Sequence, residues 1–352
     1  MRRRRPVDLT IVVGTGRCGS TLLSRILREH PDVLSVSEFF STLGVGRKLP
    51  TGELDGAELW GLLSAPATFL DALIRDGLKP PELYYPYGKG RFDPATGVPV
   101  ICHSVLPLLT DDPDGLFDRL AAEIPAWPRR PAADQYRHVF RLLAGLYGRR
   151  FVVERSGASL VMVERLRRLF PEARFVHLHR DGPDCALSMS RHPSFRWQTL
   201  AISAVRAAGL PPTATLEEVE AALPARFRGL ICPPYNADLL MGYPIPVHVF
   251  GAQWWSAMVC DGVASLRELP REAWISMSYE ALLRGPEAEL RRLAEFAGLP
   301  VPARWLEAAR RLVDPGRAGR ARAELDAESL AALRAACEPG AAAIAAAEHS
   351  LS

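Results

Sequence analysis

The chain has at residues 9–21 the sequence Leu9-Thr10-Ile11-Val12-Val13-Gly14-Thr15-Gly16-Arg17-Cys18-Gly19-Ser20-Thr21. Its first five residues are apolar or β-branched, as in a strand that is buried in a parallel sheet. The glycine-rich turn leads into a segment whose apolar residues, Leu22, Leu23, Ile26 and Leu27, predict one face of a helix. The stretch therefore predicts a strand, a tight loop and a helix.

This loop has the features of an anion site. Backbone N–H groups at the start of a helix point at a bound anion, and the helix dipole adds to the attraction. The residues that allow close approach or supply polar hydrogens are Gly14, Gly16, Gly19, Arg17, Ser20 and Thr21. The alternative is an ordinary tight turn between strand and helix.

The spacing of Gly14 and Gly19 also matches the start of a nucleotide-kinase loop, Gly-x-x-x-x-Gly-Lys-[Ser/Thr]. Ser20 stands where that loop has its lysine. The missing lysine disfavours nucleoside triphosphate chemistry.

Further strands and helices alternate along the chain and predict an α/β fold, a parallel sheet flanked by helices with right-handed crossovers. The predicted strands after the first are Val33–Val36 leading to Glu38, Val98–His103, Phe151–Glu154, Phe175–His179 and Trp274–Tyr279. The segments 42–150 and 193–250 are less regular and are expected to be insertions, and the last third is helical. We expect one domain over residues 1–352.

Composition excludes several classes of function. A net charge of +3 gives no reason to expect nucleic acid as a partner. The six cysteines include no Cys-x-x-Cys pair, so neither a disulfide framework nor a zinc or other metal site is indicated. The basic start, Arg2–Arg5, is followed by too short an apolar run for a signal peptide, and no stretch approaches the roughly 20 apolar residues of a membrane span. We expect a cytoplasmic protein.

A second anion motif is His179-Arg180-Asp181-Gly182-Pro183-Asp184-Cys185-Ala186-Leu187-Ser188. Arg180 ends a predicted strand, and Ser188 follows about two helical turns later. A plain alternative is an Arg–Asp pair that closes the corner between strand and helix, with Ser188 facing solvent.

The first loop resembles the 5′-phosphosulfate loop of the sulfotransferase family, whose pattern is Arg/Lys-Ser-Gly-Thr/Ser-Thr; Cys18 departs from its usual Ser. The resemblance implies a P-loop-like sulfotransferase fold and binding of 3′-phosphoadenosine-5′-phosphosulfate (PAPS) as co-substrate. It assigns cofactor binding to Gly16, Arg17, Cys18, Gly19, Ser20 and Thr21, and it implies that Arg180 and Ser188 clamp the 3′-phosphate.

Weaker matches extend the resemblance. Val153–Ser156 is similar to a family strand, with Arg155 in place of Lys, and Tyr279–Pro300 is similar to a late family segment. Gly319–Arg322 resembles a segment that closes over the cofactor.

Two residues compete for the role of catalytic base, beside Arg17 as the stabiliser of developing charge. Glu38 lies 21 residues after Arg17 and resembles the glutamate base of tyrosylprotein and bacterial glycolipid sulfotransferases. His103 resembles the histidine base of cytosolic sulfotransferases, with two extra residues before Leu106-Pro107-Leu108. Glu38 is preferred, and a buried structural histidine remains an alternative for His103.

The expected function is transfer of a sulfuryl group to a hydroxyl of a small, hydrophobic or carrier-bound acceptor. The hydrophobic preference rests on aromatic residues outside the motifs, among them Tyr84, Tyr85, Trp197, Tyr235 and Trp255. The rival functions are a P-loop kinase or triphosphatase and a non-catalytic module that binds phosphoadenosine. Cys18, at a helix N-terminus beside Arg17, is either a reactive thiol or a passive replacement for Ser.

Overall fold

A computed structural model describes residues 9–44, 49–211 and 213–351. The arginine-rich start at residues 2–5, for which the sequence predicts no signal peptide, lies outside the described residues.

The centre of the molecule is a five-stranded sheet in which every neighbouring pair is parallel, with the order β2-β5-β1-β6-β7. Its strands are β1 (Leu9–Val13), β2 (Val33–Ser37), β5 (Phe151–Arg155), β6 (Arg174–His179) and β7 (Trp274–Ser278). The chain leaves β1 toward one side of the sheet, to β2, and later crosses from β5 to β6 on the other side of β1. The carboxyl end of β1 is therefore a switch point, where open α/β sheets bind ligands.

Helices cover both faces of the sheet and make up the insertions. Up to β5 they are α1 (Ser20–Arg28), α2 (Phe39–Gly44), α3 (Gly56–Ser64), α4 (Thr68–Arg75), α5 (Val100–Ser104), α6 (Pro113–Glu123) and α7 (Ala132–Leu146). Up to β7 they are α8 (Val163–Leu169), α9 (Gly182–Ser190), α10 (Pro193–Ala208), α11 (Leu216–Ala222), α12 (Ala237–Gly242), α13 (Val247–Phe250) and α14 (Ala257–Arg267). The last five are α15 (Tyr279–Arg284), α16 (Pro286–Ala297), α17 (Ala303–Leu312), α18 (Arg320–Glu324) and α19 (Ala327–Leu351).

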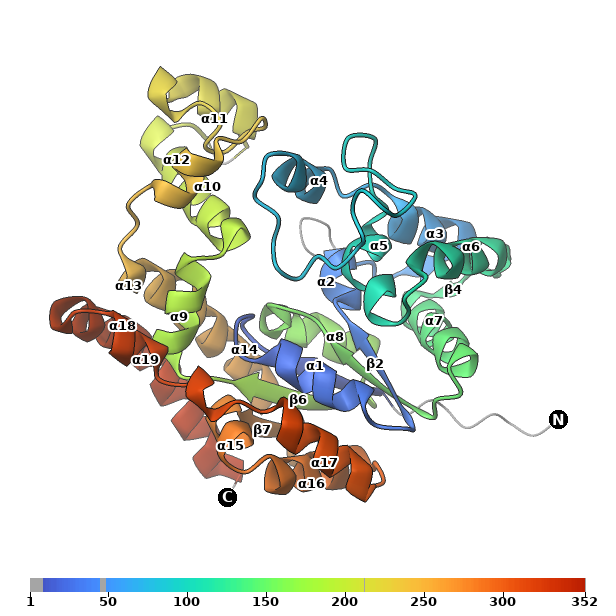
Figure 1. Cartoon of the computed structure of the whole chain (residues 1–352). Coiled ribbons are helices and arrows are strands. Elements are labelled where there is room, and N and C mark those ends of the chain that lie inside the picture. Colours follow the sequence, from blue (N-terminus) through green and yellow to red (C-terminus); the bar gives the residue numbers. More distant parts are fainter. Residues whose placement is uncertain (1–8, 45–48, 212, 352) are drawn as a thin grey trace.

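Figure 1 shows the arrangement of these layers: α1 lies in front of the sheet, while α8 and α14 lie behind it. The two insertions rise above the sheet, with α4 on one side and α10, α11 and α12 on the other. The parallel α/β architecture predicted from the sequence, with helical insertions and a helical C-terminal third, is confirmed.

The apolar residues form two clusters. The larger is built on the sheet strands and the helices beside them, and residues such as Ile11, Val36 and Val176 have no measurable exposure there. The smaller joins α4 to α10, α11 and α12, with Leu73, Val219 and Leu240 fully buried. The second insertion thus has a core of its own, which fixes its helices against α4.

Two local predictions were wrong. Val98–His103 was predicted to be a strand, but Val100–Ser104 is helix α5 and Pro99 makes only an isolated bridge with Pro66. Short apolar runs do not distinguish a buried strand from a buried helix. The segment 193–250 was predicted to be irregular, yet it contains the 16-residue helix α10.

The expectation that no stretch approaches the length and apolar composition of a membrane span needs one correction. Within the described residues, one helix is long and apolar enough, by length and composition alone, to cross a membrane: Ala327–His349 in α19. Alanine supplies most of that hydropathy. Of its most apolar window 28% is buried, and Leu333, Cys337 and Ala347 belong to the larger cluster.

Candidate active site

The carboxyl ends of all five sheet strands lie at one edge of the sheet, and the predicted anion loop follows the central strand β1 there. The loop has a left-handed backbone at Gly16 (φ 75°), Arg17 (φ 57°) and Gly19 (φ 91°). Glycine adopts this conformation without strain, whereas Arg17 is strained by it. Left-handed non-glycine residues that persist in a fold often mark functional sites.

Close packing explains two of the glycines. A Cβ atom on Gly19 would lie 2.1 Å from the ring of Tyr279, the first residue after β7. A Cβ on Gly14 would lie 2.6 Å from Cys18 Sγ and 2.8 Å from the carbonyl oxygen of Leu178. The loop is therefore tightly enclosed by the neighbouring strand ends.

Cys18 points inward rather than toward a ligand. It is 1% exposed, and burial raises the pKa of its thiol above the ordinary value of 9.0. The hypothesis of a reactive thiol with a lowered pKa was therefore wrong, because the loss of hydration outweighs the helix terminus and nearby positive charge. Ser20 and Thr21 begin α1, with Ser20 half-buried and Thr21 exposed.

The side chain of Arg17 joins the two predicted motifs. Its Nε donates a hydrogen bond to Ser188 Oγ at 3.1 Å, across 171 positions of sequence. Its Nη1 forms an ion pair with Glu82, from the first insertion. Arg17 and Ser188 thus belong to one site, and Glu82 is a part of it that the sequence did not predict.

Glu82 also binds His192, which directly precedes α10. His192 Nε2 lies 2.9 Å from Glu82 Oε2. Burial alone would raise the pKa of Glu82, but the His192 hydrogen bond, together with the positive charges of His192 and Arg17, lowers it to about 2. An ionised carboxylate only accepts hydrogen bonds, so the Nε2–H of His192 is the donor in this contact.

Arg180 lies between β6 and α9, where the sequence predicted a contact to the 3′-phosphate. Its Nη2 binds Asp184 Oδ2 at 2.9 Å and the carbonyl oxygen of Arg317 at 2.8 Å, and its guanidinium lies over the ring of Tyr279. Its Nε is buried and has no hydrogen-bond partner among the described residues. The Arg180–Asp184 pair of the alternative interpretation is therefore present, and the Nε–H of Arg180 remains available to a ligand.

Asp184 fixes the late segment that resembles the cofactor-closing segment. Its carboxylate accepts hydrogen bonds from the backbone N–H groups of Gly319 and Ala321, both at 2.8 Å. The segment beginning at Gly319 therefore lies against the start of α9, beside Arg180.

A cavity of about 550 Å³ opens beside this corner. It is lined by residues 179–183 on one side and by α19 on the other, with Trp255 and Glu280 between them.

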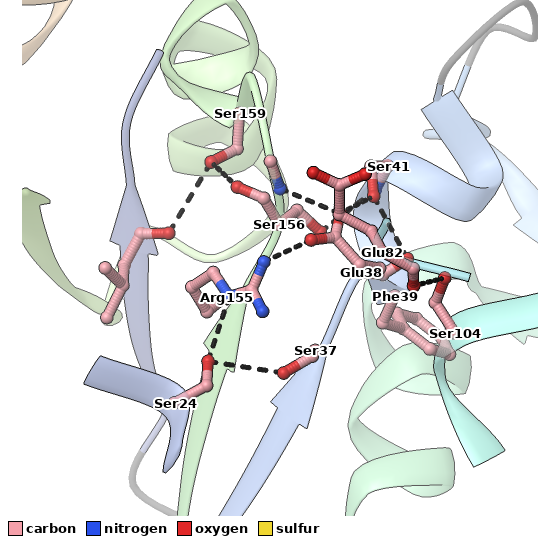
Figure 2. Close-up of polar contacts among 12 residues, drawn as sticks. Ser24, Ser37, Glu38, Phe39, Ser41, Glu82, Ser104, Arg155, Ser156 and Ser159 are labelled. Carbon is pink, nitrogen blue, oxygen red and sulfur yellow. Dashed lines mark hydrogen bonds and ion pairs between the residues drawn. The ribbon is translucent and has the colours of Figure 1, made fainter. Parts of the chain in front are cut away.

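Glu38 follows β2 with a left-handed backbone (φ 63°) and lies in a network of buried polar groups (Figure 2). It forms an ion pair with Arg155 at the end of β5, and its Oε2 accepts hydrogen bonds from Ser41 Oγ (2.6 Å) and the Gly157 N–H (2.8 Å). Arg155 in turn donates its Nε to Ser24 Oγ at 2.9 Å. Every sheet residue of this network lies at the edge that carries the loop.

Glu154, next to Arg155 on β5, is a buried carboxyl that the sequence did not single out. Its Oε1 accepts hydrogen bonds from the backbone N–H groups of Phe39 and Phe40 and from Ser156 Oγ. Burial is the main cause that raises its pKa to about 8. Glu154 therefore anchors the start of α2 while carrying a proton at neutral pH.

His103 lies in helix α5, not at the end of a strand, and is 1% exposed. Its Nδ1 is 2.7 Å from the hydroxyl of Tyr87, and its Nε2 is 3.5 Å from Asp71 Oδ1. The next residue, Ser104, donates to the backbone carbonyl of Glu82 at 2.8 Å (Figure 2). The structure thus brings Arg17, Ser188 and Glu82 together, while His103 contacts Tyr87 and Asp71 instead.

Most of the aromatic residues expected near an acceptor lie elsewhere. Tyr85 and Trp255 are buried in the larger apolar cluster, and Tyr235 is buried in the smaller one. Besides Tyr279, the aromatic side chain of Phe195 lies against the loop, with its Cζ 3.6 Å from the Cβ position of Gly16. Its ring packs against Trp254, with centroids 5.8 Å apart.

Comparison with known proteins gives one family match. Residues 120–227 match the model of the sulfotransferase family. This segment contains Arg180, Ser188 and His192 but not the anion loop. No significant match was found among curated protein sequences.

Several solved structures are similar over nearly their whole length. The sulfotransferase domain of the curacin biosynthetic pathway is 14% identical, with a TM-score of 0.45, covering 94% of this chain and 97% of that one. The sulfotransferase domain of the Synechococcus PCC 7002 olefin synthase is 15% identical, with a TM-score of 0.46 and 96% of each chain covered. A sulfotransferase from Alicyclobacillus acidocaldarius is 15% identical, with a TM-score of 0.39, covering 97% of this chain and 96% of that one. Residues 120–227, with Arg180, Ser188 and His192 among them, are therefore the part of the chain that is similar to the sulfotransferase family.

Proposed function

We propose that this protein transfers a sulfuryl group from PAPS to a hydroxyl of a small, hydrophobic or carrier-bound acceptor. The observation that carries the proposal is the hydrogen bond between Arg17 and Ser188. It joins a loop suited to a 5′-phosphosulfate to a motif suited to a 3′-phosphate, and a donor with both groups needs the two side by side.

The residues present fit such a donor. The backbone N–H groups of the loop and the start of α1 suit the 5′-phosphosulfate, together with Arg17. Arg180 suits the 3′-phosphate for two reasons. Its buried Nε has no partner among the described residues, and only its Nη2 contacts the carboxylate of Asp184. The segment beginning at Gly319 lies close enough to Arg180 to cover a bound nucleotide.

The donor supplies an activated sulfuryl group; the protein's task is to align it and to stabilise charge. Arg17 and the amide hydrogens of the loop stabilise negative charge on the leaving phosphate. This requires no covalent intermediate with the protein, as in phosphoryl transfer.

Glu38 is the proposed acceptor of the hydroxyl proton. Its Oε2 contacts the N–H of Gly157, and the next N–H, that of Ala158, is 3.5 Å from the Cβ position of Gly16. The carboxylate is therefore one residue away from the anion loop. A base in this place contributes roughly 10²–10⁴ in rate. His103 is the second candidate, and its contacts with Tyr87 and Asp71 suit a structural histidine as well.

Phe195 and Trp254 support a hydrophobic acceptor. They form an aromatic wall against the loop at Gly16, on the side of the second insertion. A hydroxyl presented on an apolar carbon skeleton would pack there.

A double-label experiment tests the proposal. The protein is incubated with pools of phenols, long-chain alcohols and carrier-bound hydroxyacyl thioesters, once with ³⁵S-labelled PAPS and once with γ-³²P-labelled ATP and Mg²⁺. We expect ³⁵S in a product and no transfer of ³²P, because the loop has Ser20 in place of the kinase lysine. Transfer of ³²P without ³⁵S would show a kinase. Tight binding of phosphoadenosine without any transfer would favour the non-catalytic module.

A further inference from the structure

The carboxylate of Glu82 forms an ion pair with Arg17, the arginine of the anion loop. Glu82 comes from the connection between α4 and α5, and its side chain reaches Arg17 across 65 positions of sequence. Both side chains are about a quarter exposed, 27% for Arg17 and 24% for Glu82. A ligand can therefore reach the pair from solvent.

The guanidinium of Arg17 is already committed on two sides. Ser188 accepts from Nε, and Glu82 accepts from Nη1. A phosphate or sulfuryl oxygen that seeks Arg17 competes with an ionised carboxylate, because the pKa of Glu82 is lowered to about 2.

We propose that Glu82 is a built-in competitor for the anion site: it holds Arg17 in the empty protein and yields it to the oxygen atoms of a bound phosphate or sulfuryl group. The inference rests on the proposed function only in taking the loop as an anion site.

The surroundings of Glu82 make such an exchange possible. His192 donates to the other carboxylate oxygen, so Glu82 keeps a partner after it releases Arg17. The Ser104 hydroxyl holds the backbone of Glu82, and this contact does not involve the side chain that moves. The exchange thus needs a side-chain rotation and leaves neither side chain without a partner.

Competition of this kind has a specific signature. Every ligand that binds Arg17 must break the same ion pair with Glu82. The affinities of all such ligands are therefore lowered by the same factor. Small anions such as inorganic sulfate then bind too weakly to fill the site, while a larger ligand with further contacts still binds.

The test is a set of calorimetric titrations with inorganic pyrophosphate, 3′,5′-phosphoadenosine and adenosine. Glu82→Gln removes the charge and keeps the shape. We expect both phosphate ligands to bind about three- to tenfold more tightly to this variant, by the same factor, and adenosine to bind equally. Glu172→Gln is the matched control, since it breaks a surface ion pair with Arg137 at the opposite edge of the sheet.

A double-mutant cycle with Arg17→Ala completes the test. In that background Glu82→Gln should have no effect on either phosphate ligand. Unchanged or weaker phosphate binding by Glu82→Gln would overturn the proposal and show that Glu82 holds Arg17 in place for the ligand. A gain in phosphate affinity that persists in the Arg17→Ala background would also overturn it. Glu82→Ala serves as a second variant that lacks the charge, and it should show the same gain in phosphate affinity. Equal binding of adenosine by wild type and variants shows that the fold is intact. The pyrophosphate arm decides this inference even if the protein does not prefer phosphoadenosine over ADP.

Discussion

Glu38 combines a left-handed backbone with an ion pair that solvent hardly reaches. Its partner Arg155 is 4% exposed, and both side chains have further hydrogen bonds, to Ser41 and Gly157 on one side and to Ser24 on the other. Such a pair contributes little net stability compared with apolar residues, but it is costly to break. The network is therefore better explained by the need for a fixed carboxylate beside the loop.

Glu38→Gln should affect stability and turnover together. Arg155 would lose its counter-charge, and we expect a loss of about 3–5 kcal/mol in the free energy of unfolding, measured with urea. Turnover should fall by roughly 10²–10⁴ in the ³⁵S assay, while the affinity for phosphoadenosine barely changes. His103→Asn is the comparison and should cost less. Near-full turnover in Glu38→Gln together with a dead His103→Asn would reverse the assignment.

Cys18 should resist alkylation in the folded protein, with or without ligand. Burial raises the pKa of the thiol above 9.0, so thiolate is scarce at neutral pH, and Sγ packs against Gly14. Mass spectrometry after iodoacetamide treatment should find Cys260, the only one of the six cysteines that is not buried, labelled first. Fast labelling of Cys18 that phosphoadenosine blocks would show instead that it lines the ligand site.

At the scale of elements, the anion loop is held by what surrounds it. Tyr279 from the end of β7 lies on Gly19, and Arg180 from the end of β6 lies over the same ring. The loop and the connection between β6 and α9 therefore meet at the aromatic side chain that begins α15.

Gly19→Ala should lower the free energy of unfolding by about 2–4 kcal/mol and abolish binding of pyrophosphate. The added Cβ meets the Tyr279 ring at 2.1 Å, and the backbone stays at φ 91°. Gly61→Ala is the control: it lies exposed in α3, without a left-handed backbone and with open space around its Cβ position, and should stabilise the protein by about 0.5–1 kcal/mol. An equal effect of both changes would contradict the tight enclosure of the loop.

The strands were predictable because each is a short apolar segment that ends in a loop with polar or glycine residues. Five of the six predicted strands are present with ends within one residue, and the wrong one, Val98–His103, is a buried helix with the same composition.

Among the residues of the candidate site, Arg17 and Ser188 were found through motifs. Glu82 and His192 carry no motif, and only the tertiary packing brings Glu82 to both Arg17 and His192. Glu154 looked like any strand residue, since its partners are backbone groups of a distant helix.

At the scale of the whole molecule, a buried carboxyl in the sheet links stability to pH. The pKa of Glu154 is raised from 4.5 to about 8 in the folded protein. The folded state therefore holds a proton that the unfolded state releases, so this contribution to stability is complete below pH 4.5 and is lost as the pH rises to about 8.

Glu154→Gln imitates the protonated form and should remove this dependence. We expect the variant to match the wild type near pH 4.5 and to become more stable relative to it up to pH 8, by on the order of 3–5 kcal/mol. Urea unfolding of both proteins across this range gives the difference directly. A difference that does not change with pH would mean that Glu154 is not protonated in the folded protein.

The central claim is that two anion sites, at Arg17 and at Arg180, form one site for a nucleotide with a 3′-phosphate. Calorimetric comparison of 3′,5′-phosphoadenosine with ADP tests it most directly. We predict at least tenfold tighter binding of phosphoadenosine, and loss of this preference in Arg180→Ala, at a cost on the order of 2–4 kcal/mol. Equal affinity of the wild type for the two nucleotides would contradict the account.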